Sequence, residues 1–460
     1  MFLLEMIPLV LLLGLVVFAR WPLNRAAPLS LAAMVVYRLV QQNLIIAAPL
    51  KGLLVGIDIC LILVGAMAFL EHLKSNGQIT QIQEELGRMT TNKVVQALLL
   101  AWIFGSFVEG ISGFGTPAML IAPLMVALGF RPLSAVVVCL LANSTAVIFG
   151  AVGTPVTVGF EGLFTDAGFV RKAALVSLLS SWLIPFFIVR SIVKLEELPG
   201  VSFREQIRLS MLFAVVFLVP FYLCARWAYE FASIIAPLIA LFIILGIYKH
   251  PHPRRLILAM KAYFIVIVLL ILSRILLGKV TETINLGSGL SHTLRLNNPG
   301  IVFLLYVLAA RGQRHIRSTL TKLSRVFVAV SSLACLSYLY FVSGFFHEIV
   351  DQVGRQLYFL LAIPLGAVGS FLAGSATVSN LFFANLIPTV YALHQLDPQI
   401  LLMMQLLGAG AGNMIALQNM AAVQAAVSLH DQENRILKQT LIPCLIYIAL
   451  MVLWARLLYF

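Results

Sequence analysis

Glycine, serine and threonine interrupt long apolar stretches of this chain at two places that share a motif. Residues 105–117 read GSFVEGISGFGTP and residues 369–380 read GSFLAGSATVSN, so both stretches begin Gly-Ser-Phe-x-x-Gly. Broken backbone at membrane depth must be packed in protein or line a polar cavity, because lipid cannot satisfy its N–H and C=O groups. A matched pair of such interruptions is the best sequence indication of the binding site of a secondary transporter.

Polar side chains at these interruptions have the chemistry to hold a small carboxylate and a hydroxyl group. Half-helix N-termini direct N–H groups and the positive end of the helix dipole toward an anion. Single Ser and Thr residues in membrane helices mostly bond their own backbone or a neighbouring helix, but two clusters at matching positions favour a site. The predicted substrate-binding residues are Asn143, Ser144, Thr145, Ser375, Thr377, Ser379 and Asn380, with Asn413 and Gln418 as weaker candidates.

Glu109 is the one carboxylate within the two motifs. An acid in a membrane segment is a candidate proton carrier or cation partner, and low dielectric favours the protonated form of a carboxyl group. The alternative is that Glu109 lies at the headgroup level or caps a hairpin helix. Arg274 late in an apolar span either pairs with an acid or extends to the interface. The predicted hairpin and coupling residues are Glu109, Gly113, Gly115, Thr116 and Arg274.

The composition is that of a polytopic helical membrane protein. The 460 residues are 61% hydrophobic and 11% charged, with a mean hydropathy of +1.02, whereas a soluble domain is about half apolar and a quarter charged. We predict a single all-α transporter domain, residues 1–460, with about 12–14 transmembrane helices. The apolar segments lie near 6–20, 27–40, 50–71, 94–109, 132–160, 170–192, 209–226, 231–248, 259–277, 299–311, 325–344, 356–373, 399–428 and 439–458.

Two further segments, 110–130 and 374–396, are too interrupted for a clean span and too apolar for an exposed loop. Each is predicted to form a re-entrant hairpin, and each precedes a long span that is broken midway, at Asn143-Ser144-Thr145 and at residues 408–413. Hairpin and broken helix thus occur twice, in an internal repeat covering 94–192 and 356–458. An inverted repeat requires an odd number of crossings between the hairpins, whereas the segments above give eight.

The net charge of +13 comes from basic residues between apolar spans. Two short loops, residues 249–261 and 311–325 (the basic loops), contain Lys and Arg without an acid, which predicts that both are cytoplasmic. The five cysteines are scattered and unpaired in sequence, and no histidine has the spacing of a metal site. No metal or other cofactor is therefore predicted, and without a phosphate-binding loop transport is expected to be driven by a gradient.

Several short motifs follow one another in the order of a known family. They are EGISGFGTP at 109–117, GFRP at 129–132, Ala142-Asn143, FGAVGTP at 149–155, Ser273-Arg274, Pro299-Gly300, GSATVSN at 374–380 and GNMIALQ at 412–418. Over about residues 94–440 the chain resembles the bacterial L-lactate permease family. It departs from the usual family pattern at Ala376, where an acid or amide is typical, at Asn413, where Lys is typical, and at Leu417, where Pro is typical.

The resemblance implies a symporter of lactate, or of a related 2-hydroxy monocarboxylate such as glycolate, in the bacterial cytoplasmic (inner) membrane. The expected partners are the small carboxylate, a proton or Na⁺ as coupling ion, the lipid bilayer and a second copy of the chain in a homodimer, but no nucleic acid. The rival hypotheses are a carrier of another anion (a dicarboxylate or arsenite), a cation exchanger of similar architecture, and a non-transporting membrane protein or lipid-substrate enzyme. An enzyme is not expected, because the 18 acidic residues are scattered in short loops.

Overall fold

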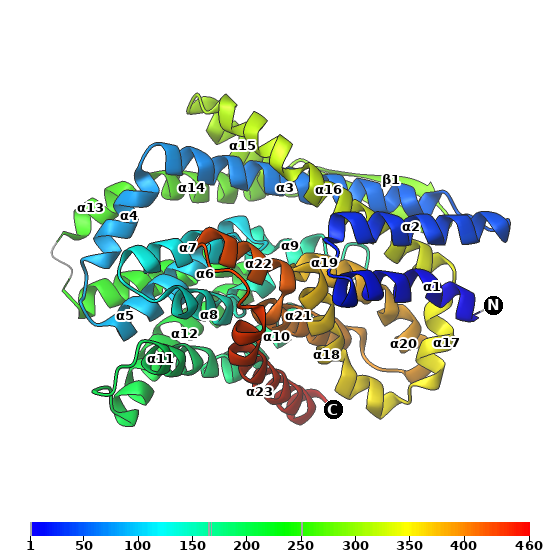
Figure 1. Ribbon diagram of the computed structural model, residues 1–460. Helices are drawn as coiled ribbons and strands as arrows, with labels where there is room; N and C mark the ends of the chain where they lie inside the picture. Colours follow the sequence, from blue (N-terminus) through cyan, green and yellow to red (C-terminus); the bar gives the residue numbers. More distant parts are fainter. Residues whose placement is uncertain (1, 164–165, 167, 250–251) are drawn as a thin grey trace.

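The computed structural model describes residues 2–163, 166, 168–249 and 252–460, and these residues are almost entirely helical (Figure 1). The predicted all-α polytopic membrane fold is confirmed. Nine of the described helices are long and apolar enough to cross a bilayer, or up to eleven if two bent pairs each count as one span, and three shorter apolar helices accompany them.

A layer of long helices lies along one side of the molecule, uppermost in Figure 1. Its elements and those joined to it are α1 (Phe2–Leu13), η1 (Gly14–Phe18), α2 (Leu23–Val40), α3 (Ala47–Ser75), α4 (Gln78–Gly87), α13 (Pro253–Ala259), α14 (Lys261–Leu277), α15 (Pro299–Ala309) and α16 (Gln313–Val342). α16 packs along α3 and α2. The contact is close, since a Cβ on Gly52 would lie 2.3 Å from the backbone nitrogen of Cys335. Small residues at such contacts are typical of helix packing in membranes.

The first hairpin spans residues 93–129. One arm comprises α5 (Lys93–Ala97), η2 (Leu98–Phe104) and α6 (Gly105–Ser112), and the other arm is α7 (Thr116–Ala127). Lys93 Nζ donates to the carbonyl oxygen of Gly129 at 2.9 Å, so the two arms begin and end together. The segment 94–109, counted above as a separate span, is therefore most of the first arm of the hairpin. The apolar arm reads as a crossing because it is buried in protein along its whole length.

A broken helix and three long helical segments follow. They are α8 (Pro132–Ala142), η3 (Ala146–Phe149), α9 (Gly150–Thr157), α10 (Gly168–Ser180), α11 (Leu183–Leu195) and α12 (Phe203–Ile247). The axis bends by 54° between α8 and the η3–α9 segment. α12 folds back on itself at Ala228, whose φ of −152° is not helical, and Tyr248 at its end lies within electrostatic range of Glu205 and Arg208 at its start. The two predicted spans 209–226 and 231–248 are thus the two limbs of α12.

The second hairpin and its broken helix repeat this plan. The elements are α17 (Phe345–Gln352), α18 (Arg355–Ala373), α19 (Ala376–Phe383), η4 (Ala384–Leu386), α20 (Ile387–His394), α21 (Pro398–Gly412), η5 (Asn413–Ile415), α22 (Leu417–Ala426) and α23 (Glu433–Tyr459). The helix breaks at 413–416, later than the predicted break at 408–413. The glycines lie inside α21 because they pack closely on α18: a Cβ on Gly408 would lie 1.9 Å from the carbonyl oxygen of Ile363.

The two hairpins approach from opposite ends of the molecule. α10 and α11 together form a helical segment of 28 residues, about 40 Å long. Near its start Lys172 pairs with Asp397, just beyond the second hairpin, at 3.3 Å. Just past its end Glu196 pairs with Lys93, at the start of the first hairpin, at 2.7 Å. Figure 1 shows the same arrangement, with α5–α7 and α18–α20 toward opposite sides.

The inverted repeat stays a prediction, and it requires an odd number of crossings between the hairpins. Residues 356–373, counted above as a span between the hairpins, lie in α18, which leads to the turn at Gly374. If α18 is the first arm of the second hairpin, seven helical segments lie between the hairpins. They are α8–α9, α10–α11, the first limb of α12, the second limb of α12, α13–α14, α15 and α16.

The described residues of both basic loops lie at the end of the molecule where α3 finishes, and most of them are helical, in α13 and at the start of α16. His315 in one loop contacts Ser75 Oγ at 3.1 Å. Arg255 and Lys261 in the other loop line a groove with Asn76. The two loops therefore share one face, as the charge pattern requires of two cytoplasmic loops; that this face is cytoplasmic stays a prediction.

A β-hairpin follows α14 at the opposite end of the molecule. Its strands, β1 (Thr281–Gly287) and β2 (Leu290–Arg295), are antiparallel with Thr281 opposite Arg295. Glu161 anchors β2 by accepting from the Thr293 N–H at 3.0 Å and pairing with Lys51 at 2.8 Å. Burial raises the pKa of the Glu161 carboxyl group, but the hydrogen bonds from His292 and Lys51 outweigh it and lower the pKa to about 2.

Candidate binding site between the hairpin tips

The tips of the two hairpins and both broken helices meet around one small pocket. Its lining residues are Glu109, Gly113, Phe114, Val147, Gly150, Ala151 and Pro155 from the first half, and Ser375, Ala376, Thr377 and Asn413 from the second. The empty volume of about 210 Å³ is small, and most of the lining side chains are buried. The repeated interruptions thus form a shared, closed polar site.

Glu109 stands at the centre of this site with 2% of its surface exposed. One carboxylate oxygen, Oε1, lies against Gly150, where an added Cβ would be only 2.7 Å away. The other oxygen, Oε2, is buried without a hydrogen-bond partner, and no ion pair joins Glu109 to any residue that the structure describes. A buried carboxylate without a cation is costly, so this group is unlike a structural ion-pair member.

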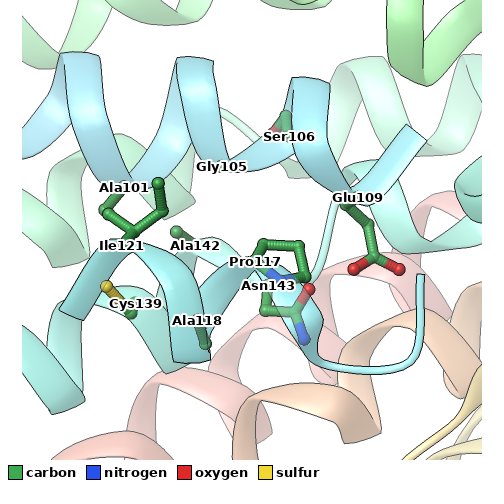
Figure 2. Close-up of a pocket in the computed structure, with 10 residues that line it drawn as sticks. All are labelled: Ala101, Gly105, Ser106, Glu109, Pro117, Ala118, Ile121, Cys139, Ala142 and Asn143. Carbon is green, nitrogen blue, oxygen red and sulfur yellow. The ribbon is translucent and has the colours of Figure 1, made fainter. Parts of the chain in front are cut away.

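A second pocket adjoins the first on the other side of Glu109, where Ser106, Pro117 and Asn143 line it (Figure 2). Asn143 caps α8 at the break, is 5% exposed, and has no hydrogen-bond partner for either its amide oxygen or its amide nitrogen. Ser106 Oγ, one helical turn before Glu109, is likewise buried without a partner. Buried polar atoms are normally satisfied, so these atoms are available to a ligand.

The backbone bends sharply where α9 borders the site. Ala151, Val152 and Gly153 have φ values of 43°, 55° and 77° in succession. A β-branched residue in the left-handed region is a true outlier, and such strain collects at ligand-binding and switch regions. Gly150, next to this turn, lies against the Glu109 carboxylate.

The tip of the first hairpin also turns through residues in the left-handed region, and here they are glycines. Gly113 and Gly115 have φ values of 62° and 73°, which allow α6 to reverse into α7. Thr116 Oγ1 donates to the Gly113 carbonyl oxygen at 2.7 Å and also contacts the hydroxyl group of Ser112. These polar groups satisfy the turn itself, so the structure gives Gly115 and Thr116 a conformational role.

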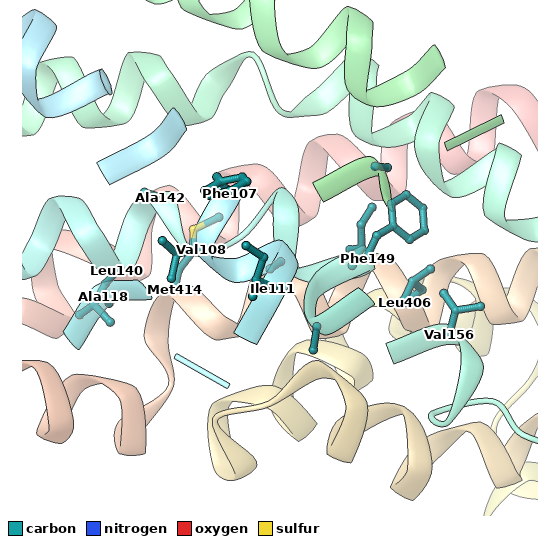
Figure 3. Packing of buried hydrophobic residues seen from close by; sticks show 14 of the residues in the cluster. Phe107, Val108, Ile111, Ala118, Leu140, Ala142, Phe149, Val156, Leu406 and Met414 are labelled. Carbon is teal, nitrogen blue, oxygen red and sulfur yellow. The ribbon is translucent and has the colours of Figure 1, made fainter. Parts of the chain in front are cut away.

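Apolar side chains from both halves surround the polar pocket. Figure 3 shows Phe107, Val108 and Ile111 of α6 close to Phe149 of η3, all buried at 2% exposure or less. Met414, from the break of the second half, is fully buried in the same cluster. This shell excludes water from the site, and electrostatic interactions inside it are correspondingly strong.

Three of the predicted binding residues are engaged in packing. Ser144 Oγ donates to Leu141 O at 3.1 Å, and Ser379 Oγ donates to Gly366 O at 2.7 Å. Thr145 Oγ1 is buried without a hydrogen-bond partner, but Thr145 is not among the lining residues of the pocket. Asn380 Nδ2 donates to the Pro155 carbonyl oxygen at 2.9 Å and thereby ties the second hairpin to the first broken helix.

The other predicted residues divide between the site and positions outside it. Ser375 and Thr377 line the pocket, and Ser375 also caps α19 by accepting from the Val378 N–H. Asn413 lines it with Nδ2 unpartnered, while its Oδ1 accepts from Asn419 at 3.3 Å. Gln418 is exposed and packs against Gly374 at the hairpin tip, but it is not among the lining residues of the pocket. In the described residues, no three His, Cys, Asp or Glu side chains are grouped to hold a metal ion.

Arg274 also lies outside this pocket. Its Nη1 pairs with Glu230 Oε2 at 2.9 Å, just past the fold-back of α12. Sequence reasoning did not select Ser106 or Glu230. Ser106 could have been selected from the sequence, because it lies three residues before Glu109 and so on the same helix face. No local pattern indicated Glu230, because its partner Arg274 is 44 residues away.

The sequence model of the L-lactate permease family matches residues 1–265 and 296–460. The chain belongs to this family. It is thus a multi-pass membrane protein of a transporter family. A relative from Haemophilus influenzae is 28% identical over 452 residues, covering 84% of each chain. The L-lactate permease of Streptococcus iniae is 28% identical over 379 residues, 74% of this chain and 79% of its own.

A shorter stretch resembles the glycolate permease GlcA of Escherichia coli, at 34% identity over 149 residues, which is 31% of this chain and 26% of that one. Residues 266–295, which include Arg274 and the β-hairpin, lie outside the family match. The departures noted at Ala376 and Asn413 fall in the pocket beside Glu109. In this chain Glu109 is the only charged residue among the lining residues of that pocket.

Proposed function

We propose that this protein carries L-lactate, or a related small 2-hydroxy monocarboxylate such as glycolate, across the bacterial inner membrane together with a proton. The observation that carries the proposal is the convergence of both hairpin tips on Glu109, with the unpartnered amide of Asn143 and the unpartnered Nδ2 of Asn413 on either side. Family membership and the names of the relatives support the substrate class.

The electrostatics of the pocket favour coupling to a proton. The substrate is an anion, and Glu109 offers it a second carboxylate. Two like charges about 4 Å apart repel by about 4 kcal/mol at an effective dielectric constant of about 20. A proton on Glu109 removes this repulsion and turns the carboxyl group into a hydrogen-bond donor to the bound anion. Anion and proton therefore bind more favourably together than apart.

The amide groups account for the hydroxy acid. Asn143 offers both a donor and an acceptor, which matches a substrate with a carboxylate and a neighbouring hydroxyl group. A site whose buried polar groups need a hydroxyl partner discriminates against an analogue that lacks it. Lactate and glycolate are therefore expected to bind more tightly than propionate and acetate.

Uptake into proteoliposomes tests this function. Purified protein should accumulate labelled L-lactate when the interior is made alkaline, and unlabelled glycolate should compete. A Na⁺ gradient at equal pH should drive no accumulation. Accumulation driven by Na⁺ would replace the proton in the proposal, and uptake of only dicarboxylates, arsenite or cations would refute the substrate class.

A further inference from the structure

Another polar pocket (the outer pocket), separate from the two beside Glu109, lies at the end of the molecule opposite the basic loops. Helices α3, α9, α12 and α14 and the β2–α15 junction enclose an empty volume of about 610 Å³. Arg274, Arg295, Glu230 and Asp58 are its charged lining residues. This volume includes space that is open to solvent, so the charged lining residues, rather than the size of the pocket, indicate a binding site.

Two arginines give this pocket the chemistry of a carboxylate site. Arg274 pairs with Glu230 at 2.9 Å, yet 39% of the Arg274 side chain is exposed, so the guanidinium retains an accessible edge. Its Cζ also lies 5.9 Å from the centre of the Phe231 ring. Arg295 Nη1 donates to the Thr157 carbonyl oxygen at 2.8 Å. A guanidinium has five N–H donors in a planar fork that suits a carboxylate. The contacts above leave other N–H donors of Arg274 and Arg295 available to a ligand.

The other acids near the outer pocket, Asp58 and Glu161, pair with other basic residues, so Arg274 pairs only with Glu230 among these acids. Asp58 pairs with His292 at 3.4 Å, and Glu161 pairs with Lys51 at 2.8 Å. These contacts hold the base of the β-hairpin and fix Arg295 at its end. Glu230 is thus the group that a ligand carboxylate would replace on Arg274.

The strained turn of α9 separates this outer pocket from the Glu109 site. Val152 lines the outer pocket, while its neighbour Ala151 lines the inner one. Gly153 backs directly on Glu230, where an added Cβ would lie 3.0 Å from the Glu230 Cα. One left-handed turn therefore contacts both sites, and a change at Glu230 reaches the wall of the Glu109 pocket through a single layer of backbone.

We propose that the Arg274–Arg295 pocket is a second, outer binding site for the carboxylate of the substrate. It rests on the proposed function and deepens it. The substrate carboxylate takes the place of Glu230 on Arg274, with Arg295 as the second cation, before it passes the α9 turn to Glu109.

Equilibrium binding of labelled L-lactate to the purified full chain tests the proposal. The wild type should bind two equivalents, and Arg274→Gln or Arg295→Gln should weaken one of them at least about tenfold, the usual scale of a lost charge-assisted contact. Glu230→Gln should have the opposite effect and tighten that same equivalent, because it frees Arg274 while keeping the side-chain shape. Asn143→Ala should weaken only the other equivalent. Arg226 is an exposed arginine on α12, the helix of Glu230. Arg226→Gln is therefore the matched control and should change the affinity of neither equivalent.

The sign of the Glu230→Gln effect separates a binding site from a structural ion pair. A structural pair predicts that Glu230→Gln and Arg274→Gln both lower the melting temperature and that neither tightens binding, which would overturn the outer site. A wild type that transports lactate but binds one equivalent, unaffected at Arg274 and Arg295, would overturn the outer site and leave the proposed function intact. Absence of any lactate binding or transport by the wild type would overturn both.

Discussion

Replacing Glu109 by Gln separates the binding of substrate from its coupling to protons. Glutamine has nearly the same size and presents a neutral group to the pocket, as protonated glutamate does. The carboxylate makes no ion pair with a described residue and its Oε2 has no partner. The substitution therefore removes the desolvation cost of a buried charge without breaking a contact, and we expect the folded protein to be at least as stable as the wild type.

The size of the effect follows from the stoichiometry of coupling. With one proton per lactate anion, a pH difference of one unit is worth about 1.4 kcal/mol and sustains about a tenfold accumulation. If Glu109 carries that proton, Glu109→Gln should reduce the accumulation ratio from about ten to about one. Exchange of internal for external lactate needs no net proton movement, so the variant should retain it.

Both quantities can be measured on the same proteoliposomes, first with an imposed pH gradient and then with unlabelled lactate preloaded inside. Glu84→Gln is a suitable control, because Glu84 is a 56% exposed surface acid and its loss should leave both activities unchanged. A variant that still accumulates lactate tenfold would refute coupling through Glu109. Loss of exchange and accumulation together, with a lower melting temperature, would instead show that the carboxylate holds the hairpin.

Three further predictions follow from contacts elsewhere. Asn380→Ala should lower the stability by about 1–3 kcal/mol in thermal melts with little change in substrate affinity. Asn143→Ala should weaken lactate binding and leave the melting temperature unchanged. The reverse pattern would refute both assignments. Glu161 has a pKa lowered from 4.5 to about 2, so it should contribute about 3 kcal/mol above pH 4.5 that is lost as the pH falls toward 2; Glu161→Gln melts should lack this acid-sensitive part. A single cysteine at Arg254→Cys should resist a membrane-impermeant thiol reagent in intact cells and react after permeabilisation, and labelling of intact cells would reverse the predicted orientation.

The architecture was predictable because apolar length and broken motifs are local properties of the sequence. The hairpins, the broken helix at Asn143 and the fold class all follow from where glycine and polar residues interrupt apolar runs. The number of membrane crossings was not predictable, because a buried hairpin arm such as residues 356–373 has the same composition as a membrane-spanning helix. The glycines from Gly408 to Gly412 were misread for a related reason: glycine is compatible with a break and with close helix packing, and only the partner helix decides between them.

The sequence singled out Glu109, Asn143 and the second hairpin tip, and the structure places them around two adjoining pockets; that they bind the substrate stays a prediction. Within each polar cluster, however, the sequence does not say which side chains face the pocket. Ser379 and Asn380 are neighbours of Thr377, yet they bond backbone carbonyls of α18 and α9. That choice depends on the rotation of α19 against two partners distant in sequence. The Glu230–Arg274 pair was out of reach for the same reason.

The closed pocket and the opposed hairpins together imply how the site becomes accessible. Its polar lining residues are buried, so a ligand reaches Glu109 only if a neighbouring element moves. Each hairpin ends at the pocket in a glycine turn with positive φ, at Gly113 and Gly374, and its open end lies at a different end of the molecule. Displacing the first hairpin would open the pocket toward the basic loops, and displacing the second would open it toward the Arg274 pocket. The second movement must break the Asn380 hydrogen bond to Pro155, which is worth about 1 kcal/mol, a cost that substrate binding can offset. Two hairpins of opposite direction at one site would allow alternating access in the proposed transport cycle, if the broken helices stay in place while the hairpins move.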